Sequence, residues 1–440
     1  MRGDLRRGLR ARWGLALLYG RALGKWLALA AATGCACGLT GSLFHIAVER
    51  VTELRAEEPW LLYGLPLAGL GIVALYKLLG TEGQGTNDIF DEVHTGGSIP
   101  LRLVPSIFLG TVLTHLCGGS AGREGAALQM GGALGYQTGR LFGFDERDLR
   151  VATTTGMAAF FTALFGTPLT AAVFSIAVVS VDSFYHAALF PSLTAALVAY
   201  GASRLFGVEP THFTVEAPAL EAGLLIRTAV LAALCGLVSM LFCGTIHFAE
   251  RQLSKRLPGP WVRAFAGGCA VVAMTLLCGS GDYNGAGMDV IAAAVEQGTA
   301  RPAAFLLKLA FTAVTLGAGF KGGEVVPSFF VGAAFGCAAG PALGIPAGFA
   351  AALGMVSVFC GAVNCPLASI ALSVELFGSG GLLYFSLACC VSYVLSGYNG
   401  LYSSQKILHS KLKGRYINVH ANDPAVEAAP PEEREGQAAL

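Results

Sequence analysis

Charged side chains are scarce in this chain. They make up only 13% of its 440 residues, whereas hydrophobic residues make up 54%. A soluble domain usually carries about 25% charged residues. Long apolar runs with so little charge therefore exclude an ordinary soluble protein and predict a multi-pass protein of the lipid bilayer. The formal net charge of +1 argues against a nucleic-acid partner, because such proteins present basic surfaces.

The 12 cysteines lack the regular spacing of a metal site or of a secreted disulfide framework. They are scattered, as in the pair Cys35 and Cys37 and the adjacent pair Cys389 and Cys390. We interpret them as small apolar residues. The sequence thus predicts no metal site and no cofactor.

The two ends of the chain are polar. MRGDLRRGLRARWG precedes the first apolar run without a convincing cleavage site, so residues 1–24 are expected to be a cytoplasmic basic leader. Four basic residues between positions 406 and 415 follow the last apolar run, which places that end in the cytoplasm too. Residues 416–440 are expected to be a disordered cytoplasmic tail. If both termini lie in the cytoplasm, the chain crosses the cell inner membrane or plasma membrane an even number of times.

The apolar segments fall into two classes of length. Five of them suit a full crossing: 62–79, 101–118, 184–205, 222–247 and 303–318. Others are short and interrupted by glycine: 124–142, 150–165, 168–181, 325–341 and 366–379. Short, broken helices at matching places in two halves are typical of a transporter site built from half-helices.

An internal repeat relates the two halves. FTALFGTPL at 161–169 is similar to FCGAVNCPL at 359–367, at an offset of 198 residues. GGALG at 131–135 is similar to GAAFG at 332–336, at an offset of 201 residues. The sequence therefore predicts an all-α bundle of two related halves, whose broken helices meet near the membrane midplane.

The first glycine-rich motif is GREG. Arg123 and Glu124 are the only Asp, Glu, Lys or Arg residues between positions 103 and 139, and Gly122 and Gly125 flank them. Glycine lets backbone N–H groups approach a ligand, and a helix N-terminus attracts anions. An ionised Glu124 would block an anion there, and a protonated one could swing away. Glu124 is therefore a candidate gate and proton carrier; the alternative is an ion pair with Arg123 that only supports packing.

A second motif, GGEVVP at 322–327, repeats this pattern with a proline that a first helical turn tolerates. The 201-residue register aligns Gly323 with Gly122, and Gly323, Val325 and Val326 become candidate anion ligands. Glu324 precedes 50 residues without Asp, Glu, Lys, Arg or His. It is a second candidate for proton transfer, protonated or paired with a partner such as Lys321. The alternative is an acid that only balances the helix dipole.

This ordered set of motifs resembles the CLC chloride channels and proton-coupled anion antiporters. GREG matches that family's gating-glutamate motif, and GGEVVP takes the place of its GxFxP motif. FGTPLTAAVF and NCPLASIAL match its paired PL helices. Leu401-Tyr402-Ser403 matches the segment that supplies a central tyrosine, which makes Tyr402 a candidate anion ligand.

The resemblance covers residues 25–415 and implies a CLC-type transmembrane transport domain. It implies an inverted repeat with halves of about 25–215 and 216–415. It also implies a homodimer with one pore in each subunit.

The family's central anion-binding serine, in its GSGIP motif, has two possible counterparts here. GGSIP at 96–100 is closest by letters, but it lies only 24 residues before Glu124. GQGTN at 83–87 has the family's spacing, with Gln84 40 residues before Glu124. We favour Gln84 for this spacing, and its amide can still donate to an anion; Ser98 is the alternative.

Three departures from the chloride transporters resemble the fluoride-exporting branch of the family. Val325 replaces the phenylalanine of GxFxP and follows the acid Glu324, the central serine is missing, and residues 151–181 carry no charge. In the chloride antiporters that last stretch holds an internal proton-transfer glutamate. The resemblance thus implies fluoride export coupled to proton import. The alternative is a passive chloride channel or a chloride/proton antiporter of the same fold.

One pattern points to an enzyme. GGSAG at 118–122 fits the G-x-S-x-G pattern of serine nucleophiles, with His186 and His247 as candidate partners. The pattern arises easily among 59 glycines, and it uses the same residues as GREG. We therefore predict that the chain is not an enzyme and that its partners are fluoride or chloride, protons and a second copy of itself.

Overall fold

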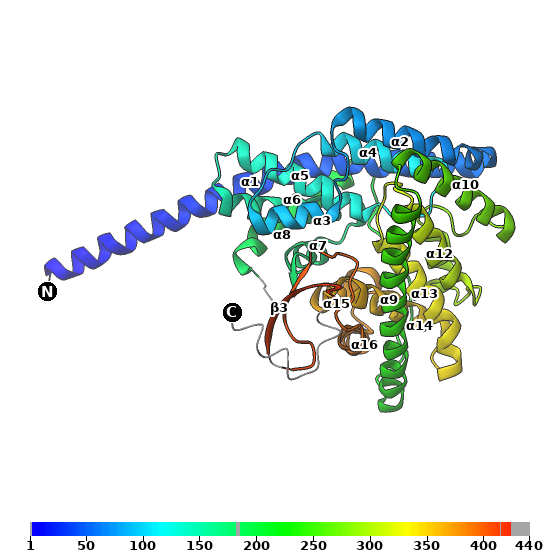
Figure 1. The fold of residues 1–440 in the computed structure, drawn as a ribbon. Coiled ribbons are helices and arrows are strands. Elements are labelled where there is room, and N and C mark those ends of the chain that lie inside the picture. Colours follow the sequence, from blue (N-terminus) through cyan, green and yellow to red (C-terminus); the bar gives the residue numbers. More distant parts are fainter. Residues whose placement is uncertain (1, 182–184, 414, 424–440) are drawn as a thin grey trace.

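The computed structural model describes residues 2–181, 185–413 and 415–423. Within them the chain forms sixteen α-helices, three short 3-10 helices and one small sheet (Figure 1). The first half contains eight α-helices: α1 (Arg2–Glu57), α2 (Leu65–Leu79), α3 (Thr86–Thr95), α4 (Leu103–Leu116), α5 (Glu124–Leu141), α6 (Glu146–Phe165), α7 (Pro168–Ala177) and α8 (Leu189–Leu205).

The second half repeats this order of long, short and broken helices. Its members are α9 (Ala222–Arg256), α10 (Pro260–Cys278), α11 (Met288–Glu296), α12 (Ala304–Gly317), α13 (Val325–Ala339), α14 (Ala347–Val363), α15 (Pro366–Phe377) and α16 (Leu382–Leu395). The packing repeats as well, because α5 packs on α6 as α13 packs on α14, and α1 packs on α8 as α9 packs on α16. The all-α fold of two related halves is thus confirmed.

Glycines set the closest helix contacts at equivalent places in each half. A Cβ atom at Gly131 would lie 2.4 Å from the carbonyl oxygen of Gly156, and one at Gly332 would lie 2.3 Å from that of Gly354. Such backbone contact is how small residues bring membrane helices together. The predicted 201-residue register between GGALG and GAAFG therefore corresponds to a real structural equivalence.

The turns before the two PL helices also match. Helix α6 ends at Gly166 with φ +71°, and α14 ends at Asn364 with φ +58°. Glycine and asparagine are the residues that adopt this left-handed conformation most readily at a helix end. Pro168 and Pro366 then open α7 and α15, which pack against each other.

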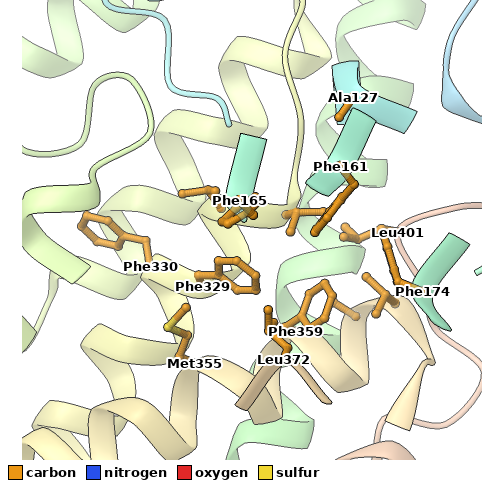
Figure 2. Close-up of a cluster of buried hydrophobic side chains, with 14 of the residues drawn as sticks. Ala127, Phe161, Phe165, Phe174, Phe329, Phe330, Met355, Phe359, Leu372 and Leu401 are labelled. Atoms are coloured by element: carbon orange, nitrogen blue, oxygen red, sulfur yellow. The ribbon is translucent and has the colours of Figure 1, made fainter. Parts of the chain in front are cut away.

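Aromatic side chains of both halves meet in a common core. Figure 2 shows Phe165 beside Phe329, whose ring centroids are 6.1 Å apart, and Phe174 beside Phe359, at 5.7 Å. These rings come from α6, α7, α13 and α14. The core thus joins the two halves.

Among the described residues, five helices are long and apolar enough to cross a membrane: Leu15–Glu57, Pro59–Leu79, Ala222–Arg256, Pro260–Cys278 and Val325–Leu343. Six shorter apolar helices accompany them. The apolar window of Val325–Leu343 is 72% buried within the protein itself, against 28% for Pro260–Cys278. The helix that follows GGEVVP is therefore a core element rather than a lipid-facing one.

The two ends differ from expectation. Helix α1 runs without a break from Arg2 to Glu57, because no proline occurs before Pro59, so residue 24 is not a structural boundary (Figure 1). The predicted start of a disordered tail at residue 416 is wrong. Tyr416–His420 forms strand β3, antiparallel to β2 (Lys406–His409), which pairs in parallel with β1 (Ser180–Val181). The rest of that expected tail, 424–440, lies outside the described residues.

Candidate functional site

The two glycine-rich loops interlock at the centre of the molecule. Gly122 N–H donates to the Gly323 carbonyl over 2.7 Å, and Gly323 N–H donates to the Gly122 carbonyl over 2.8 Å. The pair forms an isolated antiparallel bridge, as a twofold relation between the halves requires. The two residues that the predicted repeat aligns, Gly122 and Gly323, are therefore in direct contact. Because each N–H group donates to the other glycine's carbonyl oxygen, neither is available as the anion donor expected from the sequence.

The interlocked loops leave no room for side chains. A Cβ atom at Gly323 would lie 2.3 Å from the backbone nitrogen of Gly125, and one at Gly322 would lie 2.4 Å from Cβ of Ala121. Helices α5 and α13 begin immediately after these loops. The glycines thus bring two helix N-termini, each with a partial positive charge, to one place.

Glu124 is the first residue of α5, and it is fully buried. Its Oε2 accepts a hydrogen bond of 2.9 Å from Arg123 N–H, and the N–H of Val326 at the start of α13 also faces this carboxylate. Its Oε1 has no hydrogen-bond partner and lies 3.8 Å from Nε of Arg123. The carboxylate therefore occupies the position between two helix N-termini that suits an anion.

Glu324 immediately precedes α13, and its carboxylate lies over the start of α5. Its Oε2 is buried without a hydrogen-bond partner, and a Cβ atom at Gly125 would lie 3.3 Å from it. The expected partner Lys321 is wrong: the residues that the structure describes contain no such ion pair. Instead Nζ of Lys321 lies 4.3 Å from the ring centroid of Tyr76, because the loop directs the two side chains apart.

Tyr402 completes the cluster. Its side chain is 2% exposed, and its hydroxyl has no hydrogen-bond partner. The ring packs edge-on against Phe90, with centroids 5.1 Å apart. The hydroxyl is close enough to the carboxylates of Glu124 and Glu324 to interact with both electrostatically. A buried, unpartnered hydroxyl beside two acids is a suitable donor to a small anion.

Contacts along α5 separate the two candidates for the central position. Thr86, next to the Gln84 loop, accepts a 3.0 Å hydrogen bond from Gln129, five residues after Glu124. Gln84 is partly buried, and its Oε1 has no partner. By contrast, Ile99 accepts a 2.6 Å bond from Gln137, thirteen residues after Glu124, and Ser98 is exposed. At 1.5 Å per residue, GGSIP lies about 20 Å along α5 from Glu124. The contacts favour Gln84.

The serine of the G-x-S-x-G pattern, Ser120, contacts two threonines of α12. Ser120 Oγ lies 3.0 Å from the hydroxyl oxygen of Thr312, and Ser120 N–H donates to Thr315 over 3.1 Å. Nε2 of the candidate partner His247 is 2.9 Å from the Gly400 carbonyl oxygen. No histidine is hydrogen-bonded to Ser120 in the part of the chain that the structure describes. The arrangement ties α12 to the GREG loop and gives no support to a nucleophile.

Sequence reasoning missed the contact that holds the Tyr402 segment to the site. Ser404 N–H donates to the Asn87 side chain over 3.1 Å, and Leu401 N–H donates to the Ala362 carbonyl over 2.9 Å. Asn87 lies in the first turn of α3, beside Gln84. Nothing in the sequence marks a pair separated by 317 residues.

Glu375 of α15 caps the start of α7. Its two oxygens accept hydrogen bonds from Leu169 N–H over 3.0 Å and Thr170 N–H over 2.8 Å, at the start of α7. Glu375→Gln removes the charge and is expected to lower the free energy of unfolding by about 1 kcal/mol. Thermal unfolding in detergent checks this, with exposed Glu209→Gln as the control. Equal melting temperatures for both variants would contradict the capping role.

Comparison with known proteins identifies the family. The family model described as voltage gated chloride channel matches residues 68–397. The chain belongs to this CLC family. A chloride/fluoride channel protein of Pseudomonas syringae pv. tomato is 37% identical over 398 residues, which cover 88% of each chain. The voltage-gated ClC-type chloride channel ClcB of Shigella flexneri is 26% identical over 376 residues, covering 81% of this chain and 87% of ClcB.

Solved CLC structures share the fold. One described as a CLC-type fluoride/proton antiporter superposes with a TM-score of 0.84 at 33% identity, covering 88% of this chain and 98% of the other. A slow cyanobacterial Cl⁻/H⁺ antiporter superposes with a TM-score of 0.73 at 21% identity, covering 84% and 94%. Members of the CLC family are membrane proteins that transport anions. They are channels and transporters rather than enzymes.

Proposed function

We propose that this CLC protein exports fluoride in exchange for protons that enter the cell. The observation that carries the proposal is the pair Glu124 and Glu324, which lie at two converging helix N-termini, each with one buried oxygen that lacks a hydrogen-bond partner. An acid in such a place can hold a proton when neutral and exclude an anion when ionised. The relatives described as a chloride/fluoride channel and a fluoride/proton antiporter support this choice of ion.

The anion is proposed to bind where the Glu124 carboxylate lies in this structure. Backbone N–H groups of Arg123 and Val326 face that position, and those of Gly125 and Val325 are proposed as further donors, since α5 and α13 both start there. The remaining donors are proposed to be the Gln84 amide and the Tyr402 hydroxyl. Fluoride is small and strongly hydrated, so it requires many donors in exchange for water.

Coupling follows from competition for one position. When Glu124 is protonated, its neutral side chain leaves the helix N-termini, and the anion takes its place. When the anion departs, the ionised carboxylate returns, because those N–H groups favour negative charge. Glu324 is proposed to hold a second proton beside the anion, since an ionised Glu324 would repel it. Each cycle then moves an anion and a proton in opposite directions.

A passive chloride channel and a chloride/proton antiporter of the same fold are the alternatives. Ion flux assays on purified protein in liposomes separate the three. A fluoride/proton antiporter moves protons against their gradient when a fluoride gradient is applied. A channel moves the anion without protons, and a chloride antiporter does the same coupling with chloride in place of fluoride.

The setting of the protein in the cell follows from the same proposal. We expect the inner membrane or plasma membrane, both termini in the cytoplasm, and a homodimer with one pore per subunit. Light scattering in detergent tests the oligomeric state, and labelling of a cysteine introduced after residue 423 in intact cells tests the orientation.

Tyr402→Phe is expected to weaken anion binding about fivefold. The substitution removes one hydroxyl donor and little volume, and one net hydrogen bond contributes about 1 kcal/mol. Calorimetric titration with fluoride measures the change, and exposed Tyr63→Phe is the control. Unchanged affinity in Tyr402→Phe would show that the ring serves only as a packing group against Phe90.

A further inference from the structure

Two cavities open beside the candidate site, one at Lys321 and one at the Tyr402 segment. One of about 380 Å³ lies between α2, α9, α10 and α12 and reaches Lys321, three residues before Glu324. The other, of about 310 Å³, lies between α9 and the segment after α16 and reaches Ser403, next to Tyr402. Both hold several water molecules by volume, and their linings include charged side chains that can order that water.

One acid lines both cavities. Glu250 and Ser254, one turn apart on α9, are the two residues that these linings share. The α9 backbone is held against α12 there, because a Cβ atom at Gly317 would lie 3.1 Å from the Glu250 nitrogen. The Glu250 side chain is exposed, yet its charge interacts with both Glu324 and Lys321. Glu250 therefore contacts solvent on one side and reaches the buried acid electrostatically on the other.

Charged groups of every neighbouring element face Glu250 or its two cavities. Glu324 and Lys321 precede α13, Arg263 projects from α10, and Glu82 follows α2. Further groups are His247 and Arg251 of α9 itself, and Tyr76 of α2. Arg263 donates to Ser254 over 3.1 Å, which leaves Glu250 as the acid on α9 that these cavities share.

Glu324 needs such a relay if it exchanges protons. Its Oε2 is shielded from solvent, and the stretch 151–181, which includes most of α6 and all of α7, holds no acid at all. We propose that Glu250 passes protons between the cytoplasmic solution and Glu324. A protonated Glu250 gives its proton to water in the Lys321 cavity, the water gives one to the Glu324 carboxylate, and Glu250 is reprotonated from the solution. This inference rests on the proposed proton coupling.

The test is the initial rate of proton movement driven by a fluoride gradient, in liposomes that contain the purified full-length protein. Glu250→Gln is expected to lower this rate about tenfold or more, since a relay without a titratable group fails. Glu250→Asp keeps the carboxyl group and is expected to restore most of the rate. Glu82→Gln, in the same cavity, is the matched control and is expected to stay within about twofold of the wild type. Fluoride titration calorimetry verifies that each variant still binds the anion.

Each outcome has a distinct meaning. Wild-type protein that moves fluoride without protons overturns the proposed antiport and this inference with it. Proton coupling in the wild type together with an unchanged rate in Glu250→Gln overturns the inference alone. Equal losses in Glu250→Gln and Glu82→Gln also overturn it, because they assign the effect to the charge of the cavity. A selective loss that aspartate restores supports a relay at Glu250.

Discussion

Replacing Glu124 with glutamine is expected to abolish proton movement while the protein stays folded. Glutamine has nearly the same volume and mimics the protonated acid, but it cannot release a proton. The side chain is fully buried, and its Oε1 is unpartnered. Glutamine keeps a side-chain oxygen that can accept the hydrogen bond from Arg123 N–H, so the substitution removes the charge and retains that contact, which argues against unfolding. We expect the proton flux to fall about 100-fold or more, measured as the pH change that a fluoride gradient drives in liposomes.

The matched control for this experiment is Glu57→Gln, at the exposed end of α1. It removes the same charge outside the site and is expected to leave proton flux unchanged. Size-exclusion profiles and melting temperatures of both variants check folding. Proton transport in Glu124→Gln at the wild-type rate would show that Glu124 is not the carrier.

Replacing Gly323 with alanine is expected to disrupt the site. The added Cβ atom would lie 2.3 Å from the backbone nitrogen of Gly125 and 3.1 Å from that of Glu124. Neither atom can rotate away, so the two loops must separate and lose the Gly122–Gly323 bridge. Overpacking of this kind costs about 1–3 kcal/mol. Because the loops position both helix N-termini, we expect anion flux to fall about tenfold or more together with the melting temperature.

Gly244→Ala makes the same chemical change where nothing lies within 4 Å of the new atom. It is expected to be neutral or slightly stabilising, because alanine favours the helical conformation of α9. Efflux assays and thermal unfolding of the two variants therefore isolate the effect of the crowded loop. Similar behaviour of both variants would contradict the account of the interlocked glycines.

The repeat was predictable because close helix packing leaves a pattern in the sequence. GGALG and GAAFG mark the backbone contacts of α5 with α6 and of α13 with α14, and the aligned Gly122 and Gly323 touch. Broken helices were predictable from glycine and proline at their ends. The choice of Gln84 over Ser98 as the central position followed from spacing alone. The contacts of α5 favour the same choice.

Other features depend on side-chain direction and on distant pairs, which a single sequence does not encode. Lys321 lies three residues from Glu324, yet it packs on Tyr76 instead of pairing with the acid. The N–H groups of Gly122 and Gly323 were expected to face an anion, but each donates to the carbonyl oxygen of the other glycine. Strand β3 was not predicted because its sequence resembles a polar tail, and it forms a strand only by pairing with β2. The role proposed for Glu250 rests on two cavities whose linings share it, which only the structure shows.

Simultaneous recording of halide efflux and pH tests the central claim most directly. Liposomes with the wild-type protein are loaded with fluoride or with chloride at equal concentration, and initial rates are compared under an opposing proton gradient. The account predicts faster efflux of fluoride than of chloride, with protons moving inward against their gradient as fluoride leaves. A fluoride-to-chloride rate ratio at or below unity, or fluoride efflux without proton movement, would contradict it.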